Sequence, residues 1–300
     1  MLPNDENHTF VCCLSSLNLL KFEEFKNTDT VYLATLFLDA VIEEFIEKAK
    51  NIKGIEDAVR FAEKSRALGL GVMGWHSFLQ SKNLPFIGIA SNAWTNIIFG
   101  HIKNEAERAT KWLAEEFGEP EWMKGTGKRN LTLTTIPPTR SSSKLAHNAS
   151  QSIEPINSNL YSDASAKGIM IMRNPFLEKL LIEKNKNTIE IWDSISDFDG
   201  SAQHLDFLTK DEKDVFLTFR EINQLELVKQ ASIRQGFLCQ SQSLNLAFFQ
   251  DASAKWINKV HITAWELGLK SLYYLKSQSK LRASNVDQRD LYTECLNCEG

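Results

Sequence analysis

The sequence predicts a mainly parallel α/β fold. Short apolar segments of strand length alternate with longer segments that carry apolar residues at helical spacing, which is typical of parallel strands joined by crossover helices. Hydrophobic residues make up 43% of the 300 residues, with 18 Phe and 7 Trp, so the chain can bury a large core. The net charge of −4 gives no general nucleic-acid footprint. No apolar run approaches the roughly 20 residues that span a membrane.

The first part of the chain predicts one strand and two helices. Residues 9–19 form an apolar run of strand length, and it needs other strands beside it because an unpaired strand exposes its edges. Apolar residues recur at helical spacing over residues 30–50, with Glu and Lys on the opposite face. Gly54 ends this pattern, and a second helix is predicted at residues 55–67.

Residues 69–74, Gly-Leu-Gly-Val-Met-Gly, have the spacing of a dinucleotide-binding turn. Their context argues against that function, because the preceding segment is predicted to be helical. In addition, no Asp or Glu lies between Glu63 and Glu105 to hold a ribose hydroxyl. We therefore expect these glycines to let a helix and a turn pack closely.

The later part of the chain predicts further alternation of helices and strands. A helix is predicted at residues 91–117, and the alternating run at 130–135 predicts a strand that enters a loop. The elements expected after that loop are a strand at 168–172, a helix from Pro175, a mixed stretch at 185–209, a helix near 211–230, a strand at 239–249, a helix at 252–268 and a strand at 272–275. Residues 277–294 are almost wholly polar and cannot bury enough apolar surface to fold alone.

The loop at residues 136–143, Ile-Pro-Pro-Thr-Arg-Ser-Ser-Ser, has the composition of an anion-binding site. Pro favours turns, and the Thr and Ser hydroxyls with their neighbouring N–H groups make a donor-rich pocket of the kind that binds phosphates. Arg140 adds a fixed positive charge. An ordinary Ser-rich surface loop has the same composition, so this stretch alone leaves both interpretations open.

The five cysteines indicate reduced thiols in a cytoplasm, because their number is odd and the polar, acidic N-terminus is no secretory signal. Cys295 and Cys298 form a C-x-x-C pair at the end of the polar tail. A zinc site would need two more nearby ligands, and a thioredoxin-type motif would sit at a helix start. The position suits a mobile dithiol that carries electrons between a buried site and an external reductant. Two incidental cysteines remain an alternative.

Two pairs of adjacent residues are ambiguous when judged from the residues alone. Tyr273 and Tyr274 fall in a predicted strand, where successive side chains point to opposite faces, so we expect one in the core and one on the surface. Cys12 and Cys13 fall in the first strand, and buried cysteines often behave as small hydrophobic residues.

Six short segments occur together in a family-specific order. They are residues 12–19 (CCLSSLNL), 66–72 (RALGLGV), 138–143 (PTRSSS) followed by 153–155 (IEP), 240–246 (QSQSLNL), 268–274 (GLKSLYY) and 295–298 (CLNC). Each is weakly specific alone, whereas six in one order are strongly specific. The chain thereby resembles, over nearly its whole length, the C-terminal half of the large catalytic subunit of class I ribonucleotide reductase.

The resemblance implies a fold and a substrate site. Residues 1–276 would form the second half of a ten-stranded α/β barrel, with parallel strands and crossover helices, and residues 277–300 a flexible tail. A ribonucleoside diphosphate would be the substrate. The residues that would hold its diphosphate are Pro138, Thr139, Arg140, Ser141 and Ser142.

The resemblance also implies redox roles. Cys12 would be one of the two thiols that reduce the ribose, and Cys13 a packing residue. Tyr274 and then Tyr273 would pass an oxidising equivalent from a radical-bearing small subunit to the cysteine that becomes a thiyl radical. The tail pair, Cys295 and Cys298, would re-reduce the active-site disulfide and then be reduced by thioredoxin or glutaredoxin.

Several family features are missing from these 300 residues, namely the Asn-x-Cys-x-Glu finger-loop motif with the thiyl cysteine, the second reducing cysteine and the regulatory nucleotide-binding regions. Since the chain opens with Met and a polar leader, we expect a separately encoded half that needs the N-terminal half of the large subunit on another chain. We expect no cofactor or metal on this chain. The dinuclear metal and tyrosyl radical would belong to the small subunit.

Two alternative functions remain open from the sequence. The chain could be a non-catalytic assembly or binding module built on the same half barrel, or a free-standing dithiol oxidoreductase. The retained Cys12, Tyr273, Tyr274, Cys295 and Cys298 argue against a decayed copy. We expect a cytoplasmic protein, in the host cytoplasm if a virus encodes it, with no membrane and no direct nucleic-acid partner.

Overall fold

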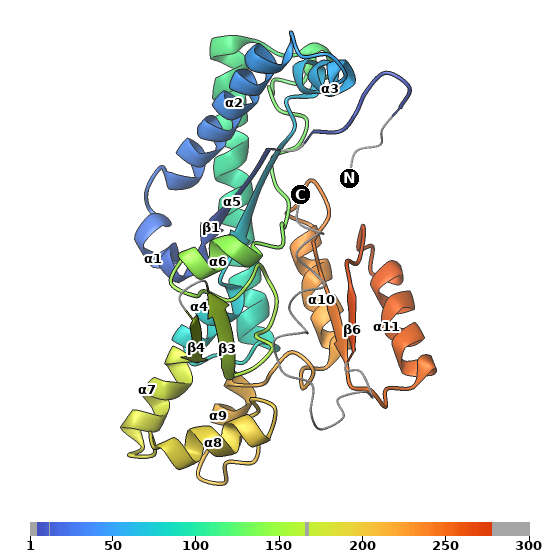
Figure 1. Cartoon of the computed structure of the whole chain (residues 1–300). Helices are drawn as coiled ribbons and strands as arrows, with labels where there is room; N and C mark the ends of the chain where they lie inside the picture. Colours follow the sequence, from blue (N-terminus) through green and yellow to red (C-terminus); the bar gives the residue numbers. More distant parts are fainter. Residues whose placement is uncertain (1–4, 12, 166–167, 278–300) are drawn as a thin grey trace.

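A computed structural model describes residues 5–11, 13–165 and 168–277 of the chain. Its strands and helices form the α/β arrangement that the sequence predicts (Figure 1). Within these residues, no helix combines the length and the apolar character needed to cross a membrane.

Five extended segments lie side by side and run parallel. Strand β1 (Cys13–Asn18) pairs with β2 (Leu68–Met73), and β5 (Leu246–Phe248) pairs with β6 (Leu275–Ser277). Residues 132–136 join the two pairs through parallel bridges from Leu70 to Thr134 and from Ile136 to Gln242. The neighbours therefore follow chain order, as in half of a parallel barrel built from successive crossover units.

Both edges of this half barrel are open within the described residues, because β1 and β6 each pair with one neighbour only. An open edge presents unpaired N–H and C=O groups, which favours pairing with further strands.

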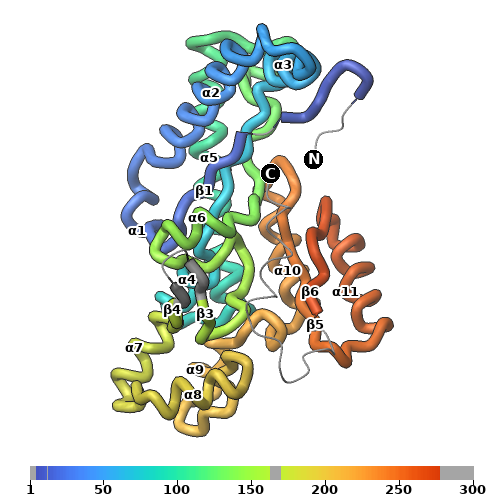
Figure 2. Tube along the Cα trace, viewed as in Figure 1, coloured from blue at the N-terminus to red at the C-terminus, as the bar shows by residue number. Residues whose placement is uncertain are grey.

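Long helices cover the sheet in the same order as the strands. Helix α2 (Thr30–Ala49) packs on α5 (Ile89–Phe117), α5 on α10 (Gln224–Gln235), and α10 on α11 (Ala254–Glu266), as Figures 1 and 2 show. The shorter elements of this region are η1 (Leu19–Lys21), α1 (Phe22–Phe25), α3 (Glu56–Ser65), α4 (Trp75–Ser81), η2 (Glu121–Met123) and α6 (Arg140–Leu145). The helices and strands share one large hydrophobic core.

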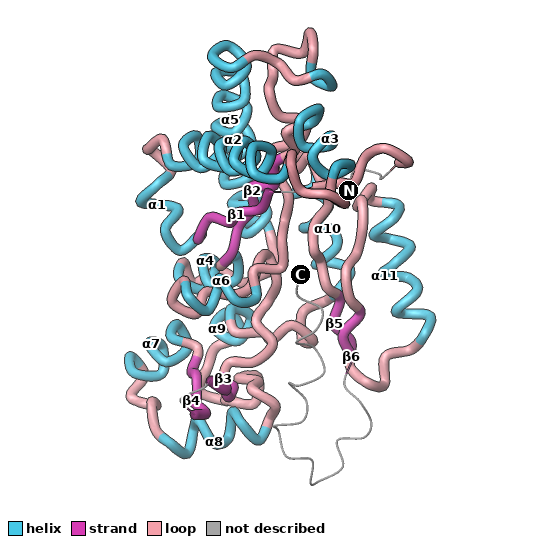
Figure 3. The backbone as a smooth tube through the Cα atoms, turned by 45° about the horizontal axis from the view of Figure 1, so that its top comes forward, coloured by secondary structure: helices cyan, strands magenta, loops and turns pink. Residues whose placement is uncertain are grey.

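The part of the sequence between the third and fourth extended segments forms a second, smaller hydrophobic core. Strands β3 (Leu160–Ser165) and β4 (Gly168–Arg173) form an antiparallel hairpin, followed by α7 (Pro175–Glu183), α8 (Ile189–Asp197) and α9 (Lys210–Val215). The hairpin, α7 and α8 gather at one end of the molecule (Figure 3). The expected strand at 168–172 is confirmed, but it departs from the parallel scheme.

Several predicted boundaries are wrong, among them the strand expected at 239–249, which is regular only over β5. The mixed stretch at 185–209 contains α8, and the single helix expected near 211–230 is two helices, α9 and α10. The second of these begins at Asn223, whose side chain accepts a hydrogen bond from the Leu225 N–H at 2.9 Å. Helix α9 has already ended at Val215, so non-helical residues 216–223 separate the two helices and this cap starts the second one. The last strand begins at Leu275, three residues later than predicted.

The interpretation of the glycines at 69–74 is also wrong, because Leu68–Met73 is the fully buried strand β2. A Cβ atom on Gly71 would lie 2.5 Å from the Thr135 carbonyl oxygen and 2.4 Å from Pro137 Cδ. The glycine therefore permits close approach of the third extended segment. Because glycine has no side chain, the glycines at alternate positions of β2 hid the hydrophobic pattern by which a strand is predicted.

Fully buried His76 on α4 predicts acid sensitivity. Its Nδ1 accepts a hydrogen bond from the Ile156 N–H at 3.0 Å, and burial lowers its pKa to about 3. Between this value and the ordinary value of 6.5 the unfolded chain binds the proton and the folded chain does not, so stability falls as pH falls through that window. We expect a loss of up to about 1.4 kcal/mol per pH unit.

Urea unfolding of the chain at pH 7 and pH 4.5 measures this effect, with His76→Gln as the comparison. The variant should show a shallower dependence of unfolding free energy on pH. Equal slopes for the two proteins would contradict the assignment to His76.

Candidate functional site

The predicted anion-binding loop follows the third extended segment, at the carboxyl end of the parallel strands. Pro138, Arg140, Ser141 and Ser142 are exposed, and Thr139 is half-buried. Helix α6 starts at Arg140 and has six residues, so its dipole adds little. Recognition of an anion would depend on the Arg140 guanidinium, the hydroxyls and the first N–H groups of the helix, which lack intrahelical partners by geometry.

Thr139 is held in a left-handed conformation with φ of 52°, which is unusual for a β-branched residue. Its carbonyl accepts a hydrogen bond from the Ser143 N–H at 2.9 Å, and its Oγ1 accepts one from the Ser152 N–H at 2.7 Å. Ser143 is buried and donates from Oγ to the Arg140 carbonyl. These contacts turn the chain sharply and leave the three residues after Thr139 facing outward.

Segments from two other elements hold the loop against the barrel. Ser77 and Ser150 form a reciprocal pair, in which each N–H donates to the other's Oγ at 3.1 and 2.9 Å. The Gly74 N–H donates to the Ser150 carbonyl at 2.7 Å. Asn18, at the end of β1, donates from Nδ2 to the Ala146 carbonyl at 3.5 Å. The loop is thus fixed by the carboxyl ends of β1 and β2.

Tyr273 and Tyr274 contact each other, with ring centroids 4.2 Å apart and ring planes at 51°. They are 47% and 51% exposed, so the expectation of one core and one surface residue is wrong. The reason is that both precede the regular strand β6 and do not alternate as strand residues do. The Tyr273 N–H donates to the Leu244 carbonyl at 2.8 Å. Two phenols in contact at a surface can pass an electron and a proton onward.

The loop and the tyrosine pair belong to one continuous ladder. Residues 240–248 pair with the third segment through the Ser243 N–H and the Ile136 carbonyl, at 2.9 Å. On the other side they pair with the tyrosine segment, where the Leu246 N–H donates to the Tyr274 carbonyl at 2.9 Å. A single extended segment therefore separates the predicted substrate loop from the predicted radical path.

The predicted cysteine roles stay predictions. Cys12, Cys295 and Cys298 lie outside the described residues. Cys13 packs partly buried against the main core, as expected for a packing residue. It lies five residues before Asn18, or about 17 Å along β1.

Sequence reasoning gave no role to several residues that support this site. Asn18 and Asn245 occur within the family-like segments, and Glu154 occurs in the Ile-Glu-Pro segment, so the signal was their position beside predicted site residues. Ser77 and Ser150 carried no sequence signal, because their pairing joins residues 73 positions apart.

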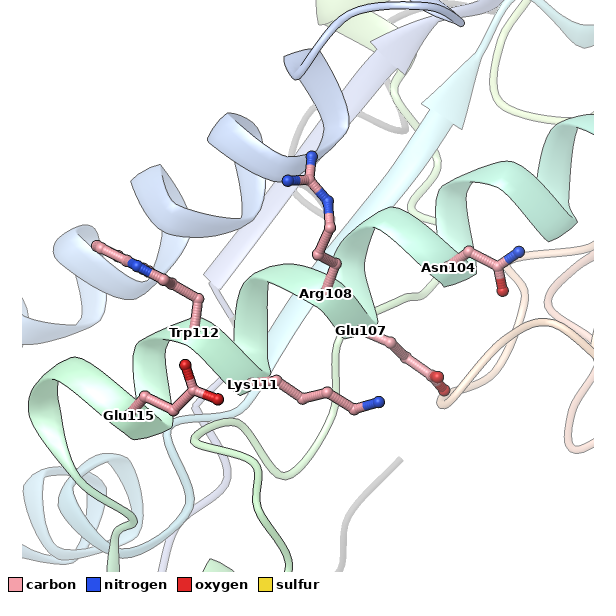
Figure 4. A pocket seen from close by; sticks show the side chains of 6 residues that line it. All are labelled: Asn104, Glu107, Arg108, Lys111, Trp112 and Glu115. Carbon is pink, nitrogen blue, oxygen red and sulfur yellow. The ribbon is translucent and has the colours of Figure 1, made fainter.

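Two surface depressions lie elsewhere. One of about 490 Å³ lies on α5 and is lined by Asn104, Glu107, Arg108, Lys111, Trp112 and Glu115, whose charged side chains spread over one helix face (Figure 4). Another of about 360 Å³ lies beyond the carboxyl end of β5, with Arg220, Asn223 and Trp256 in its wall. Neither includes a predicted site residue. The described residues contain no cluster of three His, Cys, Asp or Glu suited to a metal ion.

Comparisons with known proteins show which family this chain resembles over its length. The profile of the family described as "Ribonucleotide reductase, barrel domain" matches residues 1–126 and 120–275. The ribonucleoside-diphosphate reductase large subunit of Invertebrate iridescent virus 3 is 39% identical, covering 100% of this chain and 49% of its own. The putative large subunit of Frog virus 3 is 38% identical, covering 100% of this chain and 54% of its own.

A solved structure is also similar, that of the Actinobacillus ureae class Id ribonucleotide reductase alpha subunit. Its TM-score is 0.88 at 48% identity, and the match covers 93% of this chain and 52% of that one. The chain therefore spans about half the length of these relatives. The predicted half-barrel fold is confirmed.

Proposed function

The chain belongs to the family of ribonucleotide reductase barrel domains, and on that basis we propose that it is a component of a ribonucleoside-diphosphate reductase. The observation that carries this proposal is the contact of Tyr273 with Tyr274, one extended segment away from a loop of exposed hydroxyls and one arginine. A loop that can bind a diphosphate and two tyrosines in contact, joined by one ladder of paired strands, suit radical chemistry on a phosphorylated ribose.

In the proposed reaction, Thr139 to Ser142 bind the diphosphate and orient the ribose along the strands. Two thiols supply two electrons and two protons. The ribose hydroxyl leaves as water, a C–H bond replaces it, and the thiols join as a disulfide. Cys12 is the thiol from this chain. The second thiol and the thiyl cysteine come from the other half of the barrel.

The tyrosine pair carries the oxidising equivalent into the site. Tyr274 would be oxidised first and Tyr273 second, and Tyr273 would pass the oxidising equivalent to the cysteine that becomes the thiyl radical. A radical-bearing small subunit, which would hold the dinuclear metal and tyrosyl radical, would supply that equivalent. Each phenol loses an electron and a proton together. The half-exposed rings support this role, because a partner subunit can reach them. Cys295 and Cys298 then reduce the disulfide, and thioredoxin or glutaredoxin restores them.

The deciding experiment is reconstitution. The purified chain, the small subunit and a dithiol reductant are mixed with and without a polypeptide that carries the other barrel half, and deoxyribonucleotide formation is measured. We expect turnover only in the complete mixture. Turnover without the other half would contradict the shared active site. A complex that assembles but never turns over would favour the non-catalytic assembly module instead.

Arg140→Ala should weaken substrate binding in the complete mixture. A charge-assisted hydrogen bond contributes about 1.5–3 kcal/mol, so the KM for the ribonucleoside diphosphate should rise roughly ten- to hundredfold. The value of kcat should change much less. Lys144→Ala, one turn further along α6, is the matched control and should leave KM within about threefold. Equal effects of both variants would indicate general charge attraction rather than a specific contact.

A further inference from the structure

Glu154 is a buried carboxylate that contacts the strand before the tyrosines and the strand after them. The residue is only 5% exposed. Oε1 accepts a hydrogen bond from the Asn245 N–H at 3.0 Å, and Oε2 lies 3.4 Å from Lys276 Nζ. One carboxylate thus joins the fourth extended segment, residues 240–248, to β6.

The Asn245 side chain extends this contact to the tyrosine pair. Its Oδ1 accepts a hydrogen bond from the Tyr274 N–H at 2.8 Å. The Tyr274 amide is therefore satisfied by a side chain rather than by the strand ladder. The Asn245 N–H, on the opposite edge of the same segment, also donates to a side chain and not to a neighbouring strand. A continued ladder would offer its N–H the Pro138 carbonyl, but the neighbouring segment has already turned into the loop, and Glu154 supplies the acceptor.

Glu154 is itself firmly placed. Its N–H donates to the Gln151 carbonyl at 3.0 Å, which closes a turn, and the Ser152 N–H in that turn donates to Thr139 Oγ1. Two residues after Glu154, the Ile156 N–H donates to buried His76. The carboxylate therefore sits on the same turn that supports the substrate loop.

The carboxylate is held at an energetic cost. Burial raises the pKa of Glu154, while Lys276 and the hydrogen bonds around Asn245 oppose that rise. A buried charge with a single, partly exposed partner adds little to stability. The contacts of Glu154 therefore indicate a role in holding two extended segments relative to each other, rather than a large contribution to stability.

We propose that Glu154 is a positioning residue, which acts through Asn245 to hold Tyr274 in contact with Tyr273. This role deepens the proposed function and rests on it for its catalytic meaning. The hydrogen-bonded chain from Glu154 to Asn245 and Tyr274 exists independently of that meaning, so the two can be tested separately.

The first test uses the full chain alone and measures backbone amide exchange at Tyr274 and Asn245. Glu154→Ala removes the acceptor and should speed exchange at both amides roughly tenfold or more. Glu154→Gln keeps an amide oxygen for the Asn245 N–H and should stay within about threefold of wild type. Exposed Glu190→Ala on α8 is the control and should change neither amide. Unchanged exchange in Glu154→Ala would overturn the proposal.

The second test uses the reconstituted reductase. Glu154→Ala should lower kcat at least about tenfold with the KM for ribonucleoside diphosphate within about twofold, and Glu154→Gln should restore most of kcat. A rise in KM at unchanged kcat, or equal damage by both variants, would overturn the positioning role. If the wild-type mixture shows no turnover, the proposed function fails, and the exchange experiment still decides whether Glu154 positions Tyr274.

Discussion

Replacing Tyr274 with Phe should abolish turnover of the reconstituted reductase, to below about one thousandth of wild type, which corresponds to at least ~4 kcal/mol of barrier. Phenylalanine keeps the ring contact, since the Tyr273 and Tyr274 centroids lie 4.2 Å apart, but it has no O–H bond to lose with the electron. The same loss is expected for Tyr273→Phe, because the two phenols act in series.

Assembly separates this effect from misfolding. Both rings are about half exposed, so removal of one hydroxyl should leave folding and complex formation intact, as sedimentation or gel filtration of the mixture would show. Tyr161→Phe on the β3–β4 hairpin is the matched control, and its turnover should be normal. Normal turnover of either Tyr273→Phe or Tyr274→Phe would remove the tyrosine pair from the mechanism.

Asp39→Ala should destabilise the chain by about 3–5 kcal/mol, because it leaves Arg66 and Arg129 with the half-exposed Glu43 as their only shared acidic partner among the described residues. Asp39 and Arg66 are 4% and 5% exposed. The Asp39 carboxylate accepts hydrogen bonds from Arg66 Nε at 2.9 Å, Arg129 Nε at 3.1 Å and Asn130 Nδ2 at 2.7 Å. This network joins α2 to the residues that precede β2 and the third extended segment.

Urea unfolding at neutral pH measures this change as a shift of the midpoint. Glu44→Ala is the matched control, since Glu44 lies on the same helix and forms an exposed pair with Lys48. Surface pairs of this kind often contribute nothing measurable. Equal midpoints for Asp39→Ala and Glu44→Ala would show that the buried network does not hold α2 in place.

The fold was largely predictable where the local pattern is strong. Residues 30–50 and 91–117 carry apolar side chains at helical spacing, and they form α2 and α5 nearly as predicted. Prediction failed where a pattern was hidden. The glycines of β2 have no side chains to alternate, and non-helical residues 216–223 separate α9 from α10 within a stretch that was expected to be one helix.

The candidate site was predictable as a set of residues but not as an arrangement. The loop at Pro138 to Ser142 and the two tyrosines were chosen by their place in an ordered series of segments. That series could not show that one extended segment separates them, nor that Glu154 and Asn245 connect the loop's supporting turn to Tyr274.

The sequence by itself determined the family, the alternation of strands and helices, and the candidate residues for binding a diphosphate or carrying a redox equivalent. Each of these depends on residue type and on spacing along the chain. Only the tertiary structure decided that the tyrosine rings touch, that Gly71 admits the third segment, and that Asp39 joins Arg66 to Arg129. These contacts depend on which distant segments of the chain pack together. The spacing of residues within one segment does not indicate which other segment it will contact.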